Sequence, residues 1–288
     1  MPKGTRLLYL IDNTRLGRQN GSPSWNTHPA FGPRVGTFWV RLPCRGSYRM
    51  EWIPTKVNPL LAAGELHVWR IHLANLEAKS HELRAILSVE EKSRGDRYIR
   101  PADGAKFVTS RAALRLILAG YLGQRADRVV IKTGEFGKPY VPKPMNYNGL
   151  QFNLSHSGEL CLVAVSYGRE IGVDAEKIRN DVAVQDLATR YFAPPEIAEL
   201  EALPNELRVL GFFLCWTRKE AYVKAKAAGL QIPLDQFSVS LTPGRPAEIQ
   251  GAETNGWTIR SLDPGDGYVA ALVTETGIDS VRYCDYMG

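Results

Sequence analysis

The sequence predicts an α+β fold, and three observations support this prediction. Two long stretches, 102–122 and 205–228, have the apolar spacing of amphipathic helices. Several short stretches have the alternation or the apolar runs that are typical of strands. Helices and strands do not alternate regularly, as they would in a doubly wound parallel sheet. We therefore expect helices packed against separated antiparallel strands.

The composition is that of a globular protein. The chain has 288 residues, enough for one large domain or two ordinary ones, and 44% of them are apolar. The longest apolar runs are far shorter than the roughly 20 residues of a membrane helix, and the N-terminus is charged where a signal peptide would be apolar. We therefore expect a cytoplasmic protein.

The four cysteines are scattered along the chain. They form no C-x-x-C pair and have no histidine at ligand spacing, so neither a zinc site nor a disulfide framework is indicated. We expect four reduced thiols, at Cys44, Cys161, Cys215 and Cys284.

The positive charge is concentrated at the N-terminus. Residues 1–50 hold eight Lys and Arg against Asp12 alone, whereas the remainder has 28 basic and 29 acidic residues. The net charge of +6 therefore does not indicate a nucleic-acid-binding protein. Residues 1–60 are rich in Gly, Pro, Asn and Ser, so we expect a basic, mostly irregular arm. Translation from Met50 and a real but dispensable arm fit the sequence equally well.

Strand and helix patterns follow the arm. Residues 65–73 alternate imperfectly, as a strand with a polar edge would. Residues 79–93 and 102–122 have helical spacing, and Gly123 is placed to end the second helix. Two short extended pieces, RVVIKT and KPYVP, follow around Gly134 and Gly137.

The next segment reads as a β-hairpin and then as helices. One strand covers 160–166, YGRE forms the turn, and 171–176 returns as the second strand. A helix, a break at Pro194 and Pro195, and another helix follow. The longest helix pattern covers 205–228 and ends at Gly229. FSVSL and YVAALVTE then have strand character near the C-terminus.

The 171–176 strand carries the first candidate site. Its odd positions are apolar, and its even positions are Gly172, Asp174 and Glu176. Two acids on one face lie roughly 7 Å apart at Cα, which is close enough to reach one cation. A solvated polar face is the plainer interpretation of this pattern. Gly172 leaves space on the acid face for another backbone or a ligand.

The helix at 205–228 carries the second candidate site. Glu220 and Lys224 are four residues apart, so they share a face, and a surface ion pair would explain them. Thr217 and Glu220 could also form a capping box, although apolar spacing continues upstream of Thr217. A carboxylate and an ammonium on one face are also what a site for a metal and a phosphate needs.

FNLSHS at 152–157 places Ser155 beside His156. Neighbours on a strand point to opposite faces, and a G-x-S-x-G elbow is lacking, so a Ser-His hydrolase is disfavoured. The histidine is either structural or a donor to phosphate.

Five motifs in order resemble the 4'-phosphopantetheinyl transferases, of the long type that activates surfactin synthetase and other polyketide and non-ribosomal peptide synthetases. The resemblance covers about residues 65–283. It rests on GKP at 137–139, FNLSHS at 152–157, IGVDAE at 171–176, RYF at 190–192 and WTRKEAYVKAKAAGL at 216–230.

The resemblance implies a pseudo-dimer of two similar α+β halves, at 61–167 and 168–288, with coenzyme A in the cleft between them. It implies transfer of 4'-phosphopantetheine from coenzyme A to a serine of an acyl or peptidyl carrier protein, in fatty acid, polyketide or non-ribosomal peptide synthesis. Adenosine 3',5'-bisphosphate is released. Nucleic acid and membrane partners are not implied, and a monomer is expected.

The resemblance also implies the site residues. Asp174, Glu176 and Glu220 match the ligands of Mg²⁺, or Mn²⁺, that also contacts the coenzyme A pyrophosphate. Glu220 is alternatively or additionally the general base, and Lys224 matches the lysine on the pyrophosphate. Mg²⁺ prefers hard oxygen ligands and commonly keeps phosphate in its shell.

The nucleotide contacts match less completely. Ser155 and His156 correspond to contacts on the 3'-phosphate side, and Lys138 with Pro139 to residues beside the adenine. In the segment 88–107, Glu91 stands where one relative has lysine. Lys92, Arg94 or Lys106 would substitute, and Phe107 replaces a small polar contact. The alternative function is a non-catalytic descendant that binds coenzyme A or a carrier protein.

Overall fold

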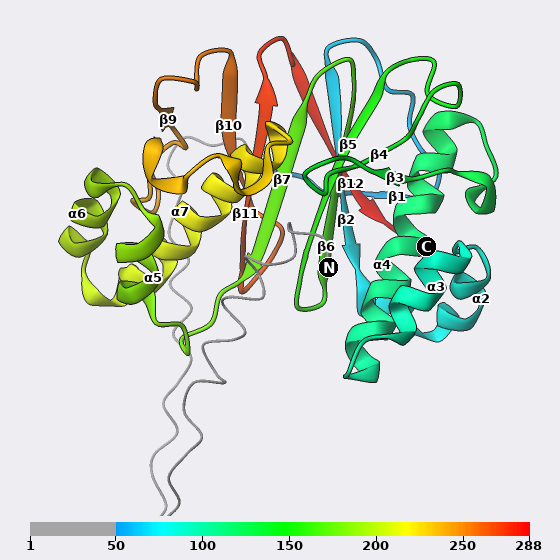
Figure 1. Cartoon of the computed structure of the whole chain (residues 1–288), viewed down its shortest axis with the longest axis horizontal. Helices are drawn as coiled ribbons and strands as arrows, with labels where there is room; N and C mark the ends of the chain where they lie inside the picture. Colours follow the sequence, from blue (N-terminus) through cyan, green and yellow to red (C-terminus); the bar gives the residue numbers. More distant parts are fainter. Residues whose placement is uncertain (1–49) are drawn as a thin grey trace, which may run out of the picture.

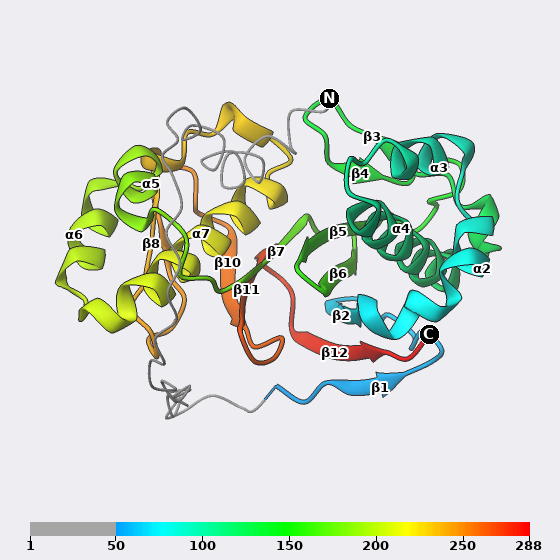
Figure 2. The ribbon, with the colours of Figure 1, turned by 90° about the horizontal axis from the view of Figure 1, so that it is seen from below.

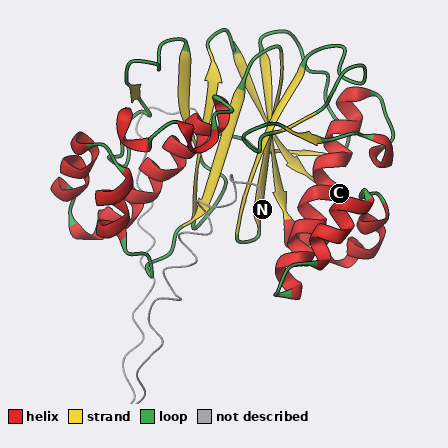
Figure 3. Ribbon diagram, viewed as in Figure 1, coloured by secondary structure: helices red, strands yellow, loops and turns green. Residues whose placement is uncertain are grey.

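The computed structural model describes residues 50–288 and has helices on two outer sides of a centre of strands (Figures 1 and 3). One sheet has the order β1-β12-β2-β6-β5 and the other β10-β11-β7. The first comprises β1 (Ile53–Thr55), β2 (Glu65–His72), β5 (Leu150–Ser157), β6 (Leu160–Tyr167) and β12 (Ser280–Tyr286). The second comprises β7 (Ile171–Lys177), β10 (Trp257–Leu262) and β11 (Tyr268–Glu275).

The helices group by half, and their bounds are η2 (Leu73–Lys79), α2 (Ser80–Ala85), α3 (Val89–Asp96), α4 (Pro101–Leu122), η3 (Ala126–Arg128), α5 (Val184–Tyr191), α6 (Pro194–Ala202), α7 (Asn205–Ala225), η4 (Gly229–Gln231) and η5 (Leu234–Gln236). Two small pairs of strands complete the structure, β3 (Lys132–Thr133) with β4 (Pro139–Tyr140) and β8 (Ser238–Val239) with β9 (Ile249–Gln250). None of the helices in 50–288 is long and apolar enough to cross a membrane. The α+β prediction is confirmed.

Three apolar cores order these elements into layers. The central core joins the two sheets through side chains such as Val68 and Leu162 of the first and Val173 and Leu272 of the second. The opposite face of the first sheet packs against α4, and the opposite face of the second sheet packs against α7. The molecule therefore has a helix, sheet, sheet, helix arrangement, which Figure 2 shows from below. Strands buried on both faces explain the continuous apolar run of β6.

The two halves repeat one topology, as the expected pseudo-dimer requires. In the first half, β2 is followed by helices including α4 and then by the β5–β6 hairpin, whose second strand pairs with β2. In the second half, β7 is followed by helices including α7 and then by β10 and β11, and β11 pairs with β7. All of these pairings are antiparallel.

The two ends of the described chain meet in the first sheet. β12 comes from the last residues of the chain, yet it lies between β1 and β2 and is parallel to both. The final strand of 168–288 therefore belongs to the sheet of the first half. Residues 53–55, at the end of the expected arm, form β1, whereas residues 1–49, with Cys44, lie outside the described residues. The other three cysteines are buried free thiols.

The expected hairpin between 160–166 and 171–176 is wrong. β6 pairs with β2 on one side and with β5 on the other, so neither of its edges is open to β7. β7 instead begins the second sheet and pairs with β11. A turn signal between two strand patterns cannot distinguish a hairpin from a crossing between sheets.

The helix expected at 79–93 is also divided. Ser88 begins a new helix, α3, because its side chain accepts the N–H of Glu91 while the Glu91 carboxylate accepts the N–H of Ser88. The ends of α4 agree with expectation, with Gly123 in the left-handed region at φ 60°. α7 ends at Ala225, three residues before the expected end.

Side chains join the two sheets where β5 lies beside β7. The side-chain oxygens of Asn153, Ser155 and Ser157 accept the backbone N–H groups of Val173, Ala175 and Lys177, at 2.9, 3.3 and 3.0 Å. Every second residue of β5 thus supplies an acceptor to every second residue of β7. We call this row of three bonds the seam, and it lies directly beside the two acids of β7.

Candidate active site

The acid face of β7 is turned toward α7 and away from solvent. Asp174 and Glu176 are only 2% and 6% exposed, so the solvated-face interpretation is wrong. Gly172 makes this contact possible, because a Cβ there would overlap the backbone of Ala221 and Ala225 in α7. The space beside the glycine is therefore filled by a helix backbone, and α7 lies directly over the strand.

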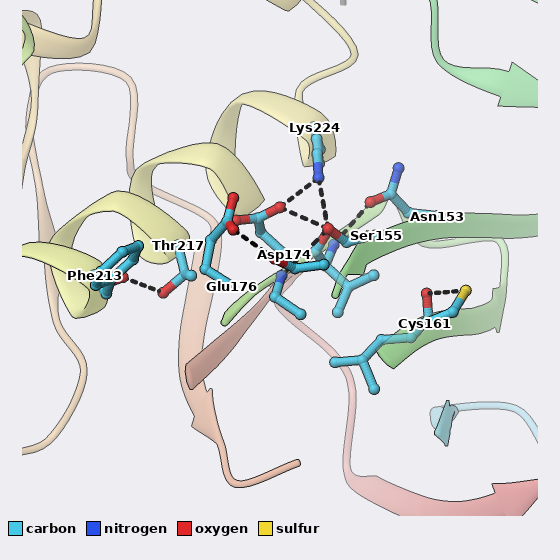
Figure 4. Close-up of polar contacts among 12 residues, drawn as sticks. Asn153, Ser155, Cys161, Asp174, Glu176, Phe213, Thr217 and Lys224 are labelled. Carbon is cyan, nitrogen blue, oxygen red and sulfur yellow. Dashed lines mark hydrogen bonds and ion pairs between the residues drawn. The ribbon is translucent and has the colours of Figure 1, made fainter. Parts of the chain in front are cut away.

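Lys224 extends from α7 to the first acid of the strand. Its Nζ lies 2.5 Å from Asp174 Oδ1 and 3.2 Å from Ser155 Oγ, and it also reaches the Val173 carbonyl (Figure 4). Burial acts to lower the pKa of Lys224, but the charges of Asp174 and Glu220 outweigh it and raise the pKa. The ammonium is therefore held in its charged form between β5, β7 and α7.

Two further carboxyl groups belong to the same cluster. Burial, and then the charge of Asp174, raises the pKa of Glu176 to about 8 and the pKa of Glu220 to about 7. Both shifts show that the three acids share one poorly solvated region.

The Thr217 hydroxyl donates to the Phe213 carbonyl at 2.9 Å, four residues back within α7, so the capping-box alternative is wrong (Figure 4).

The residue chemistry fits a hard divalent cation. Asp174 Oδ2 is buried without a hydrogen-bond partner, and carboxylate oxygens are the ligands that Mg²⁺ prefers. The side chains are not arranged as a coordination shell. Among residues 50–288, no group of three or more His, Cys, Asp or Glu is positioned to hold a metal ion. Lys224 instead occupies the other Asp174 oxygen.

Serines of β5 orient both strand acids. Ser155 Oγ donates to Asp174 Oδ1 at 2.8 Å, and Ser157 Oγ donates to Glu176 Oε2 at the same distance. Each serine also accepts a β7 N–H in the seam, so one hydroxyl fixes both the strand and its carboxylate. Our sequence reasoning missed Ser157 and Asn153. The period-two polar pattern N-x-S-x-S in FNLSHS was the signal that could have identified them.

His156 and the first half supply basic groups near this cluster. The His156 side chain is exposed. Even so, the surrounding protein desolvates the ring and lowers its pKa, and the charges of Lys224 and Arg94 act in the same direction. Arg94 lies over the Phe107 ring, with Cζ 5.0 Å from its centroid. Lys106 forms an ion pair with Glu159 at 2.5 Å. His156 and Arg94 are exposed to solvent, whereas Lys106 is half-buried and paired with Glu159.

Glu91 does not lie at the nucleotide side of the site, where the segment 88–107 was expected to contribute. It is 8% exposed and accepts from Arg111 and Arg115, both at 2.6 Å. It therefore belongs to the interior of the first half and does not face a nucleotide. Of the basic residues considered with it, Lys92 donates to the Ala85 carbonyl at 3.3 Å.

Lys138 connects the two halves. Its Nζ lies 2.6 Å from Glu170 Oε2 and also donates to the Ile171 and Ala225 carbonyls, at the start of β7 and the end of α7. Pro139 follows in β4. The Lys138 ammonium is thus committed to protein groups, and the structure does not bring it to the acid cluster.

Comparison with known proteins gives two adjoining family matches. The model described as "4'-phosphopantetheinyl transferase, N-terminal" matches residues 75–168, and the model described as "4'-phosphopantetheinyl transferase superfamily" matches residues 170–273. The first match begins after β2 and extends through β6, and the second extends from β7 into β11.

Individual relatives match across both halves. The 4'-phosphopantetheinyl transferase HetI of a Nostoc species is 40% identical over 221 residues, which is 77% of this chain and 92% of the relative. A 4'-phosphopantetheinyl transferase of Bacillus subtilis is 31% identical over 66% of this chain and 83% of its own length. The transferase Sfp of Bacillus subtilis strain 168 is 24% identical over 68% and 85%, respectively.

Proposed function

The chain belongs to the 4'-phosphopantetheinyl transferase superfamily, and on this premise we propose that it converts apo carrier proteins into their holo forms. The substrates are coenzyme A and a serine of an acyl or peptidyl carrier protein, as in the holo-[acyl-carrier-protein] synthase reaction. One observation carries the proposal. Lys224, Asp174 and Ser155 meet in one buried cluster beside Glu176 and Glu220, built from elements of both halves.

We assign Mg²⁺, or Mn²⁺, to Asp174, Glu176 and Glu220. The unpartnered Asp174 Oδ2 and the two neighbouring carboxyls are the support for this assignment. When bound, the cation would neutralise charge that develops on the pyrophosphate. Ser155 and Ser157 would hold the first two acids in position through the hydrogen bonds that they already make.

The proposed reaction is a displacement at phosphorus. The serine oxygen of the carrier bonds to the phosphorus that bears pantetheine, and the bond from that phosphorus to the bridging oxygen breaks. Adenosine 3',5'-bisphosphate leaves with the bridging oxygen. Glu220 is assigned the serine proton, as base or through water, in addition to its role as ligand. Lys224 is assigned to the charge on the leaving phosphate, since fixed charge in a desolvated site stabilises such a group strongly.

The nucleotide is assigned to polar and basic groups around His156, of which His156 and Arg94 are exposed, Lys106 is half-buried and Ser155 is buried. Ser155, His156, Arg94 and Lys106 would contact the 3'-phosphate side. Lys138 and Pro139 would line the adenine through their main chain or the aliphatic part of the lysine, because the ammonium is held by Glu170.

One assay tests the function. The protein is incubated with coenzyme A, Mg²⁺ and an apo carrier protein, and the carrier is weighed by mass spectrometry. We expect a gain equal to one phosphopantetheine, and adenosine 3',5'-bisphosphate in the solution. If the protein binds coenzyme A but produces no mass gain on several carriers that a known transferase modifies, only the non-catalytic alternative would remain.

Variants of the cluster sharpen the assay. Asp174→Asn and Glu220→Gln should each reduce turnover at least about a hundredfold, because both groups act on charge in a desolvated site. Circular dichroism and thermal unfolding serve as the control for folding. Full turnover in either variant would remove that residue from the proposed mechanism.

A further inference from the structure

A buried lysine lies next to the proposed site but points away from it. Lys219 of α7 is fully buried, and its Nζ contacts Glu196 Oε2 at 2.8 Å and the carbonyls of Leu234 and Phe237 at 2.6 and 2.7 Å. These three contacts use all three donors of the ammonium. We call this group of residues the Lys219 clamp. It ties α7 to α6 and to the loop that follows α7.

The first half contains the same arrangement. Arg115 of α4 donates to Glu91 Oε2 at 2.6 Å and to the carbonyls of Ala126 and Val129 at 3.0 and 2.8 Å. We call this group the Arg115 clamp. In both clamps the two carbonyl groups that accept from the cation are three residues apart and follow the long helix.

The two glutamates also hold equivalent positions in their helices. Glu91 lies at the third position of α3, and its carboxylate accepts the N–H of Ser88 at 2.9 Å. Glu196 lies at the third position of α6, and its carboxylate accepts the N–H of Ala193 at 2.7 Å. The clamps are therefore two copies of one device, related by the repeat of the fold.

Only the second copy is followed on its long helix by charged side chains of the proposed site. One and five residues after Lys219 come Glu220 and Lys224, whereas the same steps from Arg115 reach Leu116 and Gly120. Successive helical residues are about 100° apart, so Lys219 can be fixed inward while Glu220 faces β7. Any rotation of α7 that loosens the clamp would therefore also move the two proposed catalytic groups.

We propose that Lys219, through its clamp with Glu196, is a positioning residue that sets the rotation of α7 over β7 and thereby places Glu220 and Lys224. This inference rests on the proposed function. Gly172 brings the two backbones into contact, so α7 cannot move closer to β7, whereas this contact leaves α7 free to rotate about its axis. Sites of this kind require side chains within about 0.5 Å and 10–20° of their productive geometry.

The test compares the two clamps. One variant is Lys219→Met with Glu196→Gln, which removes the charge pair and keeps an acceptor for the Ala193 N–H. The control is Arg115→Met with Glu91→Gln. Arg111 also pairs with Glu91, so the control loses a second ion pair and is expected to be the less stable of the two. A third variant, Lys219→Arg, keeps the positive charge and places in the Lys219 clamp the residue type found in the Arg115 clamp.

Three quantities are measured at a temperature where all variants are folded: thermal stability, turnover on a carrier protein, and Mn²⁺ binding in the presence of coenzyme A by electron paramagnetic resonance. The Lys219 clamp variant should lose at least about tenfold in turnover and in Mn²⁺ affinity, since a displacement of about 1 Å can cost a hundredfold in rate. The Arg115 clamp variant should keep Mn²⁺ affinity and turnover at saturating coenzyme A within about twofold, because α3 and α4 carry no proposed metal ligand or catalytic group. Arg94 and Lys106 do lie on these helices, so a displacement there should appear as a higher KM for coenzyme A. Lys219→Arg should recover most of the loss.

The outcomes separate the two proposals. Wild-type protein that neither binds Mn²⁺ with coenzyme A nor modifies a carrier would overturn the proposed function. If the wild-type protein does both, but the clamp variants lose turnover only in proportion to their loss of stability, the positioning role alone would be overturned. Unchanged turnover and Mn²⁺ affinity in the Lys219 clamp variant would also overturn the positioning role.

Discussion

Gly172 shows how much of the site depends on one missing methyl group. The glycine lies on the acid face of β7, where the backbone of α7 passes at Ala221 and Ala225. In the first half, the corresponding layer between β2 and α4 contains bulky groups, with Trp69 and His67 hydrogen-bonded to Tyr121. The two halves thus use one topology with different spacings, and only the close-packed half brings acids and a lysine together.

Gly172→Ala should therefore push α7 away from β7. We expect a loss of about 1–3 kcal/mol in the free energy of unfolding, because the added methyl meets backbone that cannot rotate away. Turnover should fall as Lys224 withdraws from Asp174. Gly134→Ala is the control, since its nearest neighbour is a single carbonyl at 3.3 Å. Urea unfolding measures the difference, and equal small losses in both variants would contradict the packing argument.

Ser157 and Asn153 offer a second test at single residues. Both accept a β7 N–H in the seam, but only Ser157 also donates to a carboxylate, that of Glu176. Asn153→Ala should cost about 1–3 kcal/mol of stability, because the buried N–H of Val173 loses its acceptor, whereas Ser157→Ala should cost less, because the N–H of Lys177 is exposed to solvent. Only Ser157→Ala should also raise the Mg²⁺ concentration needed for half-maximal turnover. A similar rise with Asn153→Ala would show that the seam acts as a whole.

The sequence named the ionisable residues of the proposed site but not the groups that hold them. Strand alternation placed Asp174 and Glu176 on one face, and helical spacing placed Glu220 and Lys224 on another, whereas their joint role in a site came from the family resemblance. Their burial did not follow, because an alternating polar face is compatible with solvent until the opposing helix is known. Ser157 escaped attention for the same reason. Hydrogen bonds between strands of different sheets leave no local periodicity in the chain.

At the scale of elements, long periodic segments were predictable and short or interrupted ones were not. The prediction for α4 was right to its last residue, and most of α7 was correct. The helix expected at 79–93 is divided, because the capping box of Ser88 and Glu91 overrides continuing helical spacing. β9 has two residues and no pattern to read. The pairing of β7 with β11 was not predictable, because the sequence does not show that both edges of β6 are already paired.

The two clamp glutamates should respond to pH in opposite directions. Glu91 is buried, which raises its pKa, but hydrogen bonds from Arg115 and Ser88 and the charge of Arg111 lower it below the ordinary value of 4.5. Its contribution to stability is therefore present above that value and is lost as the pH falls through the folded pKa. Burial raises the pKa of Glu196, and the single cation Lys219 does not reverse the effect. Its contribution is largest below 4.5 and is lost as the pH rises through the folded pKa.

Urea unfolding of wild type, Glu91→Gln and Glu196→Gln at pH 7 and at about pH 4 measures both effects. As the pH falls, the stability difference between wild type and Glu91→Gln should shrink, whereas that between wild type and Glu196→Gln should grow. Parallel changes in the two variants would contradict the assigned directions.

At the scale of the molecule, residues 50–55 connect the two halves. β1 pairs with β12 in the first sheet, and Trp52 Nε1 donates to the Asp263 carbonyl, after β10 of the second sheet, at 2.8 Å. Arg70 lies over the Trp52 ring and also donates to the Pro264 carbonyl. The part of the expected arm that lies within the described residues is therefore an integral part of the fold.

Two truncations should consequently differ. Removal of residues 1–49 leaves every contact described above in place, so turnover and the melting temperature should stay close to those of the full chain. Removal of residues 1–60 also deletes β1 and the contacts of Trp52, and should lower the melting temperature by several degrees. Differential scanning calorimetry compares the two. A collapse of turnover with the shorter deletion would show that residues 1–49 contribute to the site.

The position of β12 also sets the order in which the molecule can be completed during synthesis. The first half is translated first, yet β2 lacks its partner on one side until residues 280–286 leave the ribosome, because β12 lies between β1 and β2. A nascent chain therefore carries an open strand edge for most of its synthesis. A nonsense mutation or a C-terminal fusion that disturbs residues 280–286 would damage the half of the molecule that was made first.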